Sequence, residues 1–486
     1  MGDNLKQKML GALAWSTIDR FGQQAVQFVI GLFLARLLTP DDYGLIGMVM
    51  LFVALSNTIV DSGFVQALIR KQDADEIDYN SVFYFNIFIS IILYFVLYFS
   101  APAIAAFFNQ PKLVLICRVI FIEIIFNSLY LIPIAKMLKD IDFKNGAKIN
   151  ILTVTFSGAV GISLAFYGAG VWALVAQQVL FHFFRMIGLH VFVKWRPRFI
   201  FSFKVIRELW GFSMNLLGTS ILNIFFNYIY VLILGKYYQK SEVGFYTQGN
   251  KLNETINYSF QTILVGSTYS LLVKIQDDDE RFRRIFREIA QKISIITFPV
   301  MLVLIGIAKP LISVLLTDKW LPSLPYFQLL CLATLFSPLY ALSMSAMNAR
   351  GQSKTTFRIE FIKKSMILAS VLICFHYGII AMLTGYVIAC FIAYLVSILY
   401  LKKDLNHFIK HQLSDFVMTL IFGASLGFFL WLFHFFITNN YVLLSSQLVS
   451  GAIVYLLVIR FFYKDTFFKV RDQLLMNTKS FTNSNK

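Results

Sequence analysis

The sequence predicts an all-α integral membrane protein with about fourteen transmembrane helices. Apolar residues make up 58% of the 486 residues, charged residues only 14%, and phenylalanine alone occurs 51 times. Runs of about 20 apolar residues recur, which is long enough to cross a hydrocarbon core of roughly 30 Å. A soluble chain of this length would usually divide into several domains with charged surfaces, so this composition excludes that class.

The apolar segments predict fourteen spans, and their ends fall at charged or turn-forming residues. The first six lie near 11–38, 43–68, 79–101, 112–133, 147–167 and 170–193. The next six lie near 209–234, 246–272, 290–308, 324–347, 357–377 and 379–401. The last two lie near 413–437 and 441–463. An even number of spans places both termini on the same side of the membrane.

Lysine and arginine gather in alternate connections between the spans. The side that holds the termini carries most of them, whereas the opposite side has only Lys112, Lys236, Lys240, Lys309 and Lys319. This bias predicts that both termini are cytoplasmic. The placement of the charges indicates that the net charge of +17 reflects topology and argues against a nucleic-acid partner, while the basic loops favour contact with anionic membrane lipids.

A repeat of about 200 residues divides the spans into two similar sets. Gly44 is matched by Gly244, Asn57 by Asn257, and Asp61 by Gln261. The repeat predicts an N-terminal six-helix bundle at 1–198 and a second bundle at 199–403, related by a pseudo-twofold axis along the membrane normal. Helices 13 and 14 (404–463) and a cytoplasmic tail (464–486) fall outside the repeat.

The first span carries a polar stripe along an otherwise apolar helix. At 100° per residue, Ser16, Asp19, Arg20, Gln23, Gln24 and Gln27 fall within an arc of roughly 140°. In the second copy, Thr219, Asn223 and Asn227 occupy the positions of Asp19, Gln23 and Gln27. We expect these stripes, with Asn57 and Asp61 on the second span, to line a shared polar cleft.

The second copy also carries a polar face on its second span. Asn250, Glu254, Asn257 and Gln261 share that face, and Lys251 lies beside it. Charged groups inside a membrane cost roughly 2.5–3.5 kcal/mol each on insertion scales, so they need a compensating environment. A solvated cleft supplies one. The alternative is structural: Asp19 or Asp61 pairs with a nearby arginine, and the amides hold helices together.

The chain resembles a known family at three places. Residues 34–44 (LARLLTPDDYG) and 61–64 (DSGF), with an echo at 242–246 (EVGFY), look like bacterial polysaccharide flippases. Those flippases belong to the multidrug/oligosaccharidyl-lipid/polysaccharide exporter superfamily, and the likeness is to its O-antigen and colanic-acid exporter branch. The motif is a turn-and-packing signature, so it indicates the family rather than the cargo.

The resemblance implies a transporter that flips an undecaprenyl-diphosphate-linked oligosaccharide, a polysaccharide or lipopolysaccharide repeat unit, outward across the bacterial inner membrane by alternating access. Basic residues of related flippases hold the diphosphate, and Arg20 and Lys251 are the candidate equivalents. Amides suit sugar hydroxyls because they both donate and accept hydrogen bonds. The candidate substrate-binding residues are Arg20, Lys251, Asp19, Gln23, Gln27, Asn57, Asn223, Asn227, Asn250 and Asn257.

Two carboxylates, Asp61 and Glu254, are the candidate ion-coupling residues. The sequence leaves open whether H⁺, Na⁺ or the membrane potential drives transport, and whether a polysaccharide polymerase or export machinery binds the chain. We expect no cofactor. We also expect no zinc site and no disulfide framework, because the four cysteines form no C-x-x-C pair.

No enzyme signature competes with transport, and the phosphate-binding loop of ATPases is absent from the sequence. Two rival functions remain open. A drug or cation antiporter of the same fold would favour carboxylates and aromatics over cations in its cavity. A membrane glycosyltransferase or polymerase would need a large outer loop, and no predicted outer loop has that size.

Overall fold

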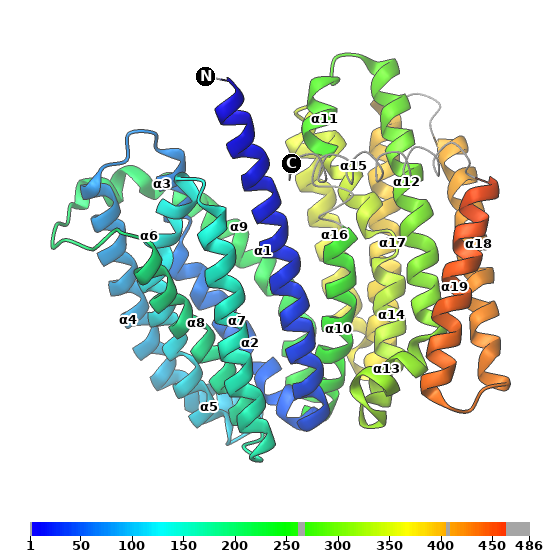
Figure 1. Cartoon of the computed structure of the whole chain (residues 1–486), viewed down its shortest axis with the longest axis horizontal. Coiled ribbons are helices and arrows are strands. Elements are labelled where there is room, and N and C mark those ends of the chain that lie inside the picture. The colour runs from blue at the N-terminus through cyan, green and yellow to red at the C-terminus, as the bar shows by residue number, and fades with distance from the viewer. Residues whose placement is uncertain (1, 261–267, 405–408, 463–486) are drawn as a thin grey trace, which may run out of the picture. The chain divides into compact units, whose positions relative to one another are not determined.

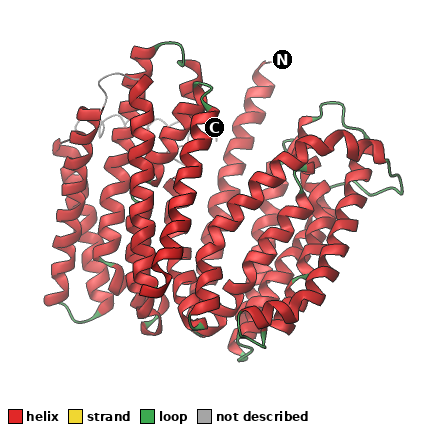
Figure 2. Ribbon diagram, turned by 180° about the vertical axis from the view of Figure 1, so that it is seen from behind, coloured by secondary structure: helices red, strands yellow, loops and turns green. Residues whose placement is uncertain are grey.

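The computed structural model describes residues 2–260, 268–404 and 409–462, and these residues form helices without strands (Figure 2). They pack as two units, 1–248 and 249–486. The predicted tail lies outside the described residues. The predicted bundle boundary at 198/199 follows the sequence repeat, and it stays a prediction.

The helices of the first unit are labelled in Figure 1. They are α1 (Gly2–Leu37), α2 (Pro40–Asp61), α3 (Phe64–Arg70), α4 (Glu76–Phe107), α5 (Leu113–Ile120), α6 (Ile122–Lys139), α7 (Phe143–Phe166), α8 (Val171–Phe192) and α9 (Phe203–Tyr237). Helix α10 (Lys240–Phe260) begins in this unit and ends in the next. Within the unit, α1 packs on α7, α2 on α9, and α6 on both α4 and α8.

The second unit continues from α10. It contains α11 (Thr268–Lys274), α12 (Asp279–Gly306), α13 (Ala308–Leu316), η2 (Asp318–Ser323), α14 (Leu324–Thr334), α15 (Ser337–Ala349), α16 (Ser353–Cys374), η3 (Phe375–Tyr377), α17 (Ile379–Asp404), α18 (Ile409–Leu432), η4 (Phe433–Phe435) and α19 (Asn440–Phe462). Here α12 packs along α18, and α17 packs on α14 and α16.

Eleven helical segments of the described residues are long and apolar enough to cross a membrane. They correspond to all but three of the predicted spans. The remaining three, 11–38, 246–272 and 357–377, overlap α1, α10 and α16, which are helical but more polar. The multi-pass membrane fold is therefore confirmed, while the count of fourteen spans remains a prediction.

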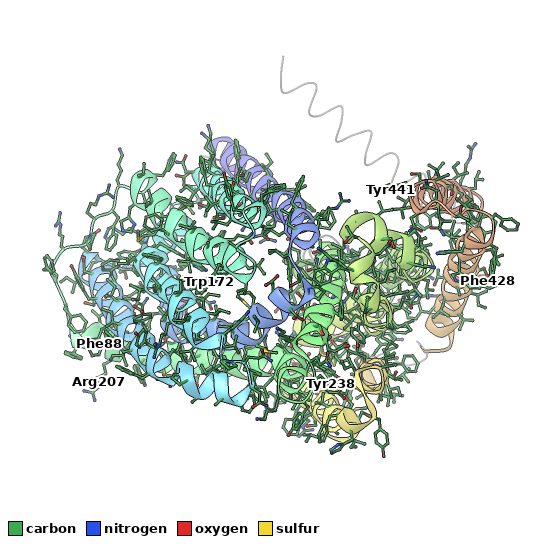
Figure 3. All side chains as sticks on the ribbon, turned by 90° about the horizontal axis from the view of Figure 1, so that it is seen from below. Phe88, Trp172, Arg207, Tyr238, Phe428 and Tyr441 are labelled. Carbon is green, nitrogen blue, oxygen red and sulfur yellow. The ribbon has the colours of Figure 1, made fainter. Side chains whose placement is uncertain are left out.

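Large apolar side chains cover the outside of both units, as a lipid environment requires. Phe88 on α4 and Phe428 on α18 are 61% and 60% exposed, and Figure 3 shows both at the outer edge of their units. In water, patches of this kind would promote aggregation. Their exposure is consistent with helices that are surrounded by lipid.

Two glycines set the packing between the starts of α2 and α10. A Cβ atom added at Gly44 would overlap the carbonyl oxygen of Lys240, and one added at Gly244 would overlap that of Pro40. Only glycine allows the two backbones to approach this closely. Gly44 and Gly244 are the matched positions of the repeat, so both copies contribute the same feature to one helix crossing.

Helix α2 has defined ends. Thr39 caps its first turn, with a capping box to Asp42 and proline at the first helical position. At the other end, Ser62 and Gly63 adopt left-handed conformations, with φ of 45° and 73°, and turn the chain into α3. This break lies in the DSGF segment and brings Asp61 to the last turn of α2.

Candidate functional site

A polar pocket lies inside the first unit, where α2 turns into α3. Its volume is about 360 Å³, within the range of ligand pockets. It is lined by residues of α2, α3, α6 and α9 and of the α2–α3 turn: Asn57, Thr58, Asp61, Gly63, Gln66, Asn127, Leu131, Leu216, Leu217 and Ser220. Two of the residues predicted from the sequence, Asn57 and Asp61, therefore share one pocket.

The amides of this pocket are connected to a buried carboxyl group. Asn127 Nδ2 donates to Asn57 Oδ1 at 3.0 Å, and Asn57 Nδ2 donates to Glu123 Oε1 at 3.1 Å. The Glu123 side chain has no exposed surface. A buried polar group is costly unless it is hydrogen-bonded, and the Asn57 amide partners Oε1, whereas Oε2 is buried without a hydrogen-bond partner among the described residues.

A second set of groups approaches the same carboxyl from α8. His182 Nε2 lies 3.5 Å from Glu123 Oε1, and His182 Nδ1 lies 2.7 Å from the Tyr130 hydroxyl. The arrangement is satisfied when the hydroxyl donates to Nδ1 and the ring proton is on Nε2, facing the carboxyl. The Arg185 guanidinium lies over the Tyr130 ring at 5.2 Å and is the last member of this group.

Sequence reasoning missed Glu123, Asn127, Tyr130 and His182 as members of one group. Glu123 shares its predicted span with Arg118, but the Arg118 guanidinium lies over the Tyr98 ring at 4.4 Å. The missed signal was helical spacing. The polar residues of α6 lie at positions i, i+4 and i+7, as Glu123, Asn127 and Tyr130, and therefore share one face.

The polar stripe of α1 lies apart from the pocket lining. Asp19 accepts two hydrogen bonds from Asn150 Nδ2 on α7, at 3.0 and 3.1 Å. Arg20 and Gln27 are exposed, and Gln23 is half-buried. Asp19 is thus held by a neighbouring helix, whereas Arg20 is accessible to a ligand.

The candidates of the second copy lie on α9 and α10. Asn223 and Asn227 are exposed on α9. Asn250 Nδ2 donates to Glu254 Oε1 one turn further along α10, at 2.8 Å. Lys251 and Glu254 are exposed, and Asn257 is half-buried. The matched residue Gln261 lies outside the described residues.

The pocket lining contains one carboxylate, Asp61, and no lysine or arginine. An anionic group such as a diphosphate would be repelled there, whereas neutral hydroxyls or a cation would be accepted. Among the described residues, no three His, Cys, Asp or Glu side chains gather in a way that could hold a metal ion. The pocket lining is therefore suited to hydrogen bonding.

Three curated relatives resemble the chain over most of its length. The succinoglycan biosynthesis transport protein ExoT of Rhizobium meliloti (strain 1021) is 23% identical over 66% of this chain and 65% of its own. The teichuronic acid biosynthesis protein TuaB of Bacillus subtilis (strain 168) is 22% identical over 95% and 97%. The lipopolysaccharide biosynthesis protein WzxC of Escherichia coli (strain K12) is 21% identical over 76% of each chain.

Solved structures share the fold. The lipid II flippase MurJ, in an inward closed conformation, matches with a TM-score of 0.76 and 17% identity, covering 94% of this chain and all of that one. An inward-facing multidrug resistance MATE transporter of the MOP superfamily matches with a TM-score of 0.61 and 16% identity, over 82% and 99%. The family described as "Polysaccharide biosynthesis protein" matches residues 33–325, and the chain belongs to that family.

Proposed function

We propose that this protein flips a lipid-linked oligosaccharide, the repeat unit of a surface polysaccharide, from the cytoplasmic to the outer face of the bacterial inner membrane. It works by alternating access, with both termini in the cytoplasm, and acts as a carrier rather than as an enzyme. The relatives are named for three different polysaccharides, so they support the class of substrate and leave the glycan open.

The observation that carries the proposal is the pocket at the α2–α3 turn. Amide, hydroxyl and carboxylate groups line it, within helices that are otherwise apolar enough to cross a membrane. Side chains of this kind hydrogen-bond sugar hydroxyls, because they supply both donors and acceptors. A glycan that must leave water to cross the membrane needs such partners.

Different residues serve the two parts of the substrate. Arg20 and Lys251 are exposed cations, and we assign them to the diphosphate. The glycan is assigned to the polar residues Asp19, Gln23, Gln27, Asn57, Asn223, Asn227, Asn250 and Asn257. The absence of a cation from the pocket lining fits this division, because the diphosphate then binds elsewhere.

Coupling to an ion is assigned to Asp61 and Glu254, with H⁺ and Na⁺ as the two candidates. The membrane potential is a further source of energy. For a dianionic headgroup, moving outward from the negative interior is favourable by about 4–5 kcal/mol per 100 mV. If flipping continues at the same rate after the potential and both ion gradients are collapsed, coupling to H⁺, to Na⁺ and to the potential is refuted.

The experiment replaces Arg20 and Lys251 by alanine, singly and together, in cells that depend on this protein for export. We expect lipid-linked oligosaccharide to accumulate on the cytoplasmic face, with export reduced at least tenfold in the double variant. Arg207→Ala is the matched control, because Arg207 is an exposed arginine at the start of α9 and outside the assigned site (Figure 3). Normal export by the double variant at normal protein levels would refute the diphosphate assignment.

A drug or cation antiporter is the second candidate function, and one observation favours it. The pocket offers a carboxylate without a neighbouring cation, which suits an organic cation, and MATE transporters share the fold. Efflux of ethidium from cells or vesicles separates the two functions. Efflux that depends on Asp61, without any effect on lipid-linked oligosaccharide, would favour the antiporter.

A further inference from the structure

We propose that Glu123 is a positioning residue, which sets the direction of the Asn57 and Asn127 amides and thereby selects the sugar that the pocket accepts. This inference rests on the proposed function, since it concerns the glycan part of the same substrate. Glu123 itself does not line the pocket, whereas both asparagines do.

The first step is the direction of the hydrogen bonds. Glu123 Oε1 is approached by two nitrogen groups, Asn57 Nδ2 at 3.1 Å and His182 Nε2 at 3.5 Å. The Oε1 atom accepts a hydrogen bond from the Asn57 amide. The NH₂ group of Asn57 therefore faces Glu123, and its carbonyl oxygen faces Asn127.

The second step carries this direction into the pocket. The Asn57 carbonyl accepts from Asn127 Nδ2 at 3.0 Å, so the NH₂ group of Asn127 is directed toward Asn57. The carbonyl oxygen of Asn127 and the second N–H of each amide are then left for a ligand. An asparagine without such a partner can present either end of its amide, because the two ends have nearly the same shape.

The third step is that the carboxyl group cannot easily turn away. Glu123 is fully buried, and contacts from two other helices hold it. His182 on α8 faces Oε1, while the Tyr130 hydroxyl on α6 holds the other side of that imidazole at 2.7 Å. A buried hydrogen-bonded network of this kind favours one arrangement over its alternatives.

The consequence is a fixed pattern of donors and acceptors in the pocket. A sugar hydroxyl that donates to the Asn127 carbonyl is favoured, and an epimer that places its hydroxyl elsewhere loses that bond. One uncompensated neutral hydrogen bond corresponds to a factor of up to about tenfold in affinity. Glu123 therefore affects which sugar is bound without touching it.

The test uses the full-length protein reconstituted in vesicles. The probes are farnesyl diphosphates that carry glucose, galactose or N-acetylglucosamine, and the measurement is the ratio of flipping rates between the best and the worst probe. We expect a ratio of about ten in the unaltered protein and of three or less in Glu123→Gln, because a glutamine can present its NH₂ group to Asn57 and let both amides turn. Glu360→Gln is the matched control, since Glu360 on α16 accepts one hydrogen bond from Tyr340 at 2.8 Å and does not line the pocket.

A double variant that exchanges the carboxylate and the amide distinguishes a positioning role of Glu123 from a purely structural one. In the double variant Glu123→Gln with Asn57→Asp, the carboxylate at position 57 only accepts, so Asn127 again directs its NH₂ group toward it. We expect this variant to recover a ratio of at least five, while Asn57→Asp alone places two carboxylates together and loses folded protein. A purely structural role of Glu123 predicts lower protein levels and an unchanged ratio.

The outcomes are distinguishable. An unaltered ratio in Glu123→Gln overturns the positioning role and leaves the flippase intact. Equal rates for all three probes in the unaltered protein also overturn it, because the pocket then does not select sugars. If no probe is flipped by the unaltered protein, the proposed function fails, and the positioning role fails with it.

Discussion

Helices α2 and α10 occupy matched positions of the repeat, and their first turns have the same surroundings while their later turns do not. Gly44 and Gly244 pack reciprocally against each other's helix, and Asp41 forms an ion pair with Lys240 at 3.0 Å. Further along α2, Asn57 is held by residues of α6. Further along α10, Asn250 is held by Glu254 of its own helix.

The difference between the two helices teaches that equivalent positions of the repeat can hold the same residue type and still make different contacts. Asn57 and Asn257 are equivalent in the repeat, yet the side-chain oxygen of Asn257 is buried without a hydrogen-bond partner among the described residues. The asparagine of α10 that does bond to another helix is Asn253, which accepts from Thr334 at 2.8 Å and corresponds to Val53 in α2. The two copies of the repeat therefore share the glycine crossing at the starts of α2 and α10 but differ in the hydrogen bonds made by their asparagines.

The largest effect is expected at the crossing itself. Gly44→Ala and Gly244→Ala each place a Cβ atom against a backbone carbonyl, so the helices must separate. Overpacking typically costs about 1–3 kcal/mol and occasionally more, and backbone is harder to move than a side chain. We expect a much lower yield of monodisperse protein and a lower melting temperature in detergent.

Gly218→Ala on α9 is the control for the crossing, because a Cβ atom there meets nothing within 4 Å. It should leave stability unchanged or raise it by up to about 1 kcal/mol, since alanine favours helix over glycine. If Gly44→Ala behaves like this control, α2 and α10 do not approach each other as closely as the structure shows.

An intermediate effect is expected where the two helices differ. Asn57→Ala removes a donor from the buried Glu123 and should lower the free energy of unfolding by about 1–3 kcal/mol. Asn250→Ala removes only a contact within one helix turn and should cost less than about 0.5 kcal/mol. Thermal unfolding of both variants in the same detergent measures the asymmetry, and equal losses would contradict it.

The smallest effect is expected at the ion pair between the two helix starts. Asp41 and Lys240 are both partly exposed, and such pairs contribute about 0–1 kcal/mol. Asp41→Asn should therefore shift the melting temperature slightly, and the shift should vanish at high salt. A loss as large as that of Gly44→Ala would mean that charge, rather than close packing, holds the crossing.

The pocket was predicted in part from the sequence. Asn57 and Asp61 stood out because amides and carboxylates are rare in apolar segments. Glu123 could not be assigned to the pocket from the sequence, since nothing in the sequence pairs it with a residue 66 positions earlier. Asp19 was predicted to face a ligand, while its contact with Asn150 is 131 residues distant in the chain.

The sequence alone determined that this is a multi-pass helical membrane protein with an internal repeat. Those properties follow from hydrophobicity and spacing, which each segment carries by itself. Only the tertiary structure decided that Asn57, Glu123 and His182 form one group, and that Gly44 lies against the start of α10. Both are contacts between helices, and a hydrogen bond or a close approach depends on the positions of two segments at once, which no single segment encodes.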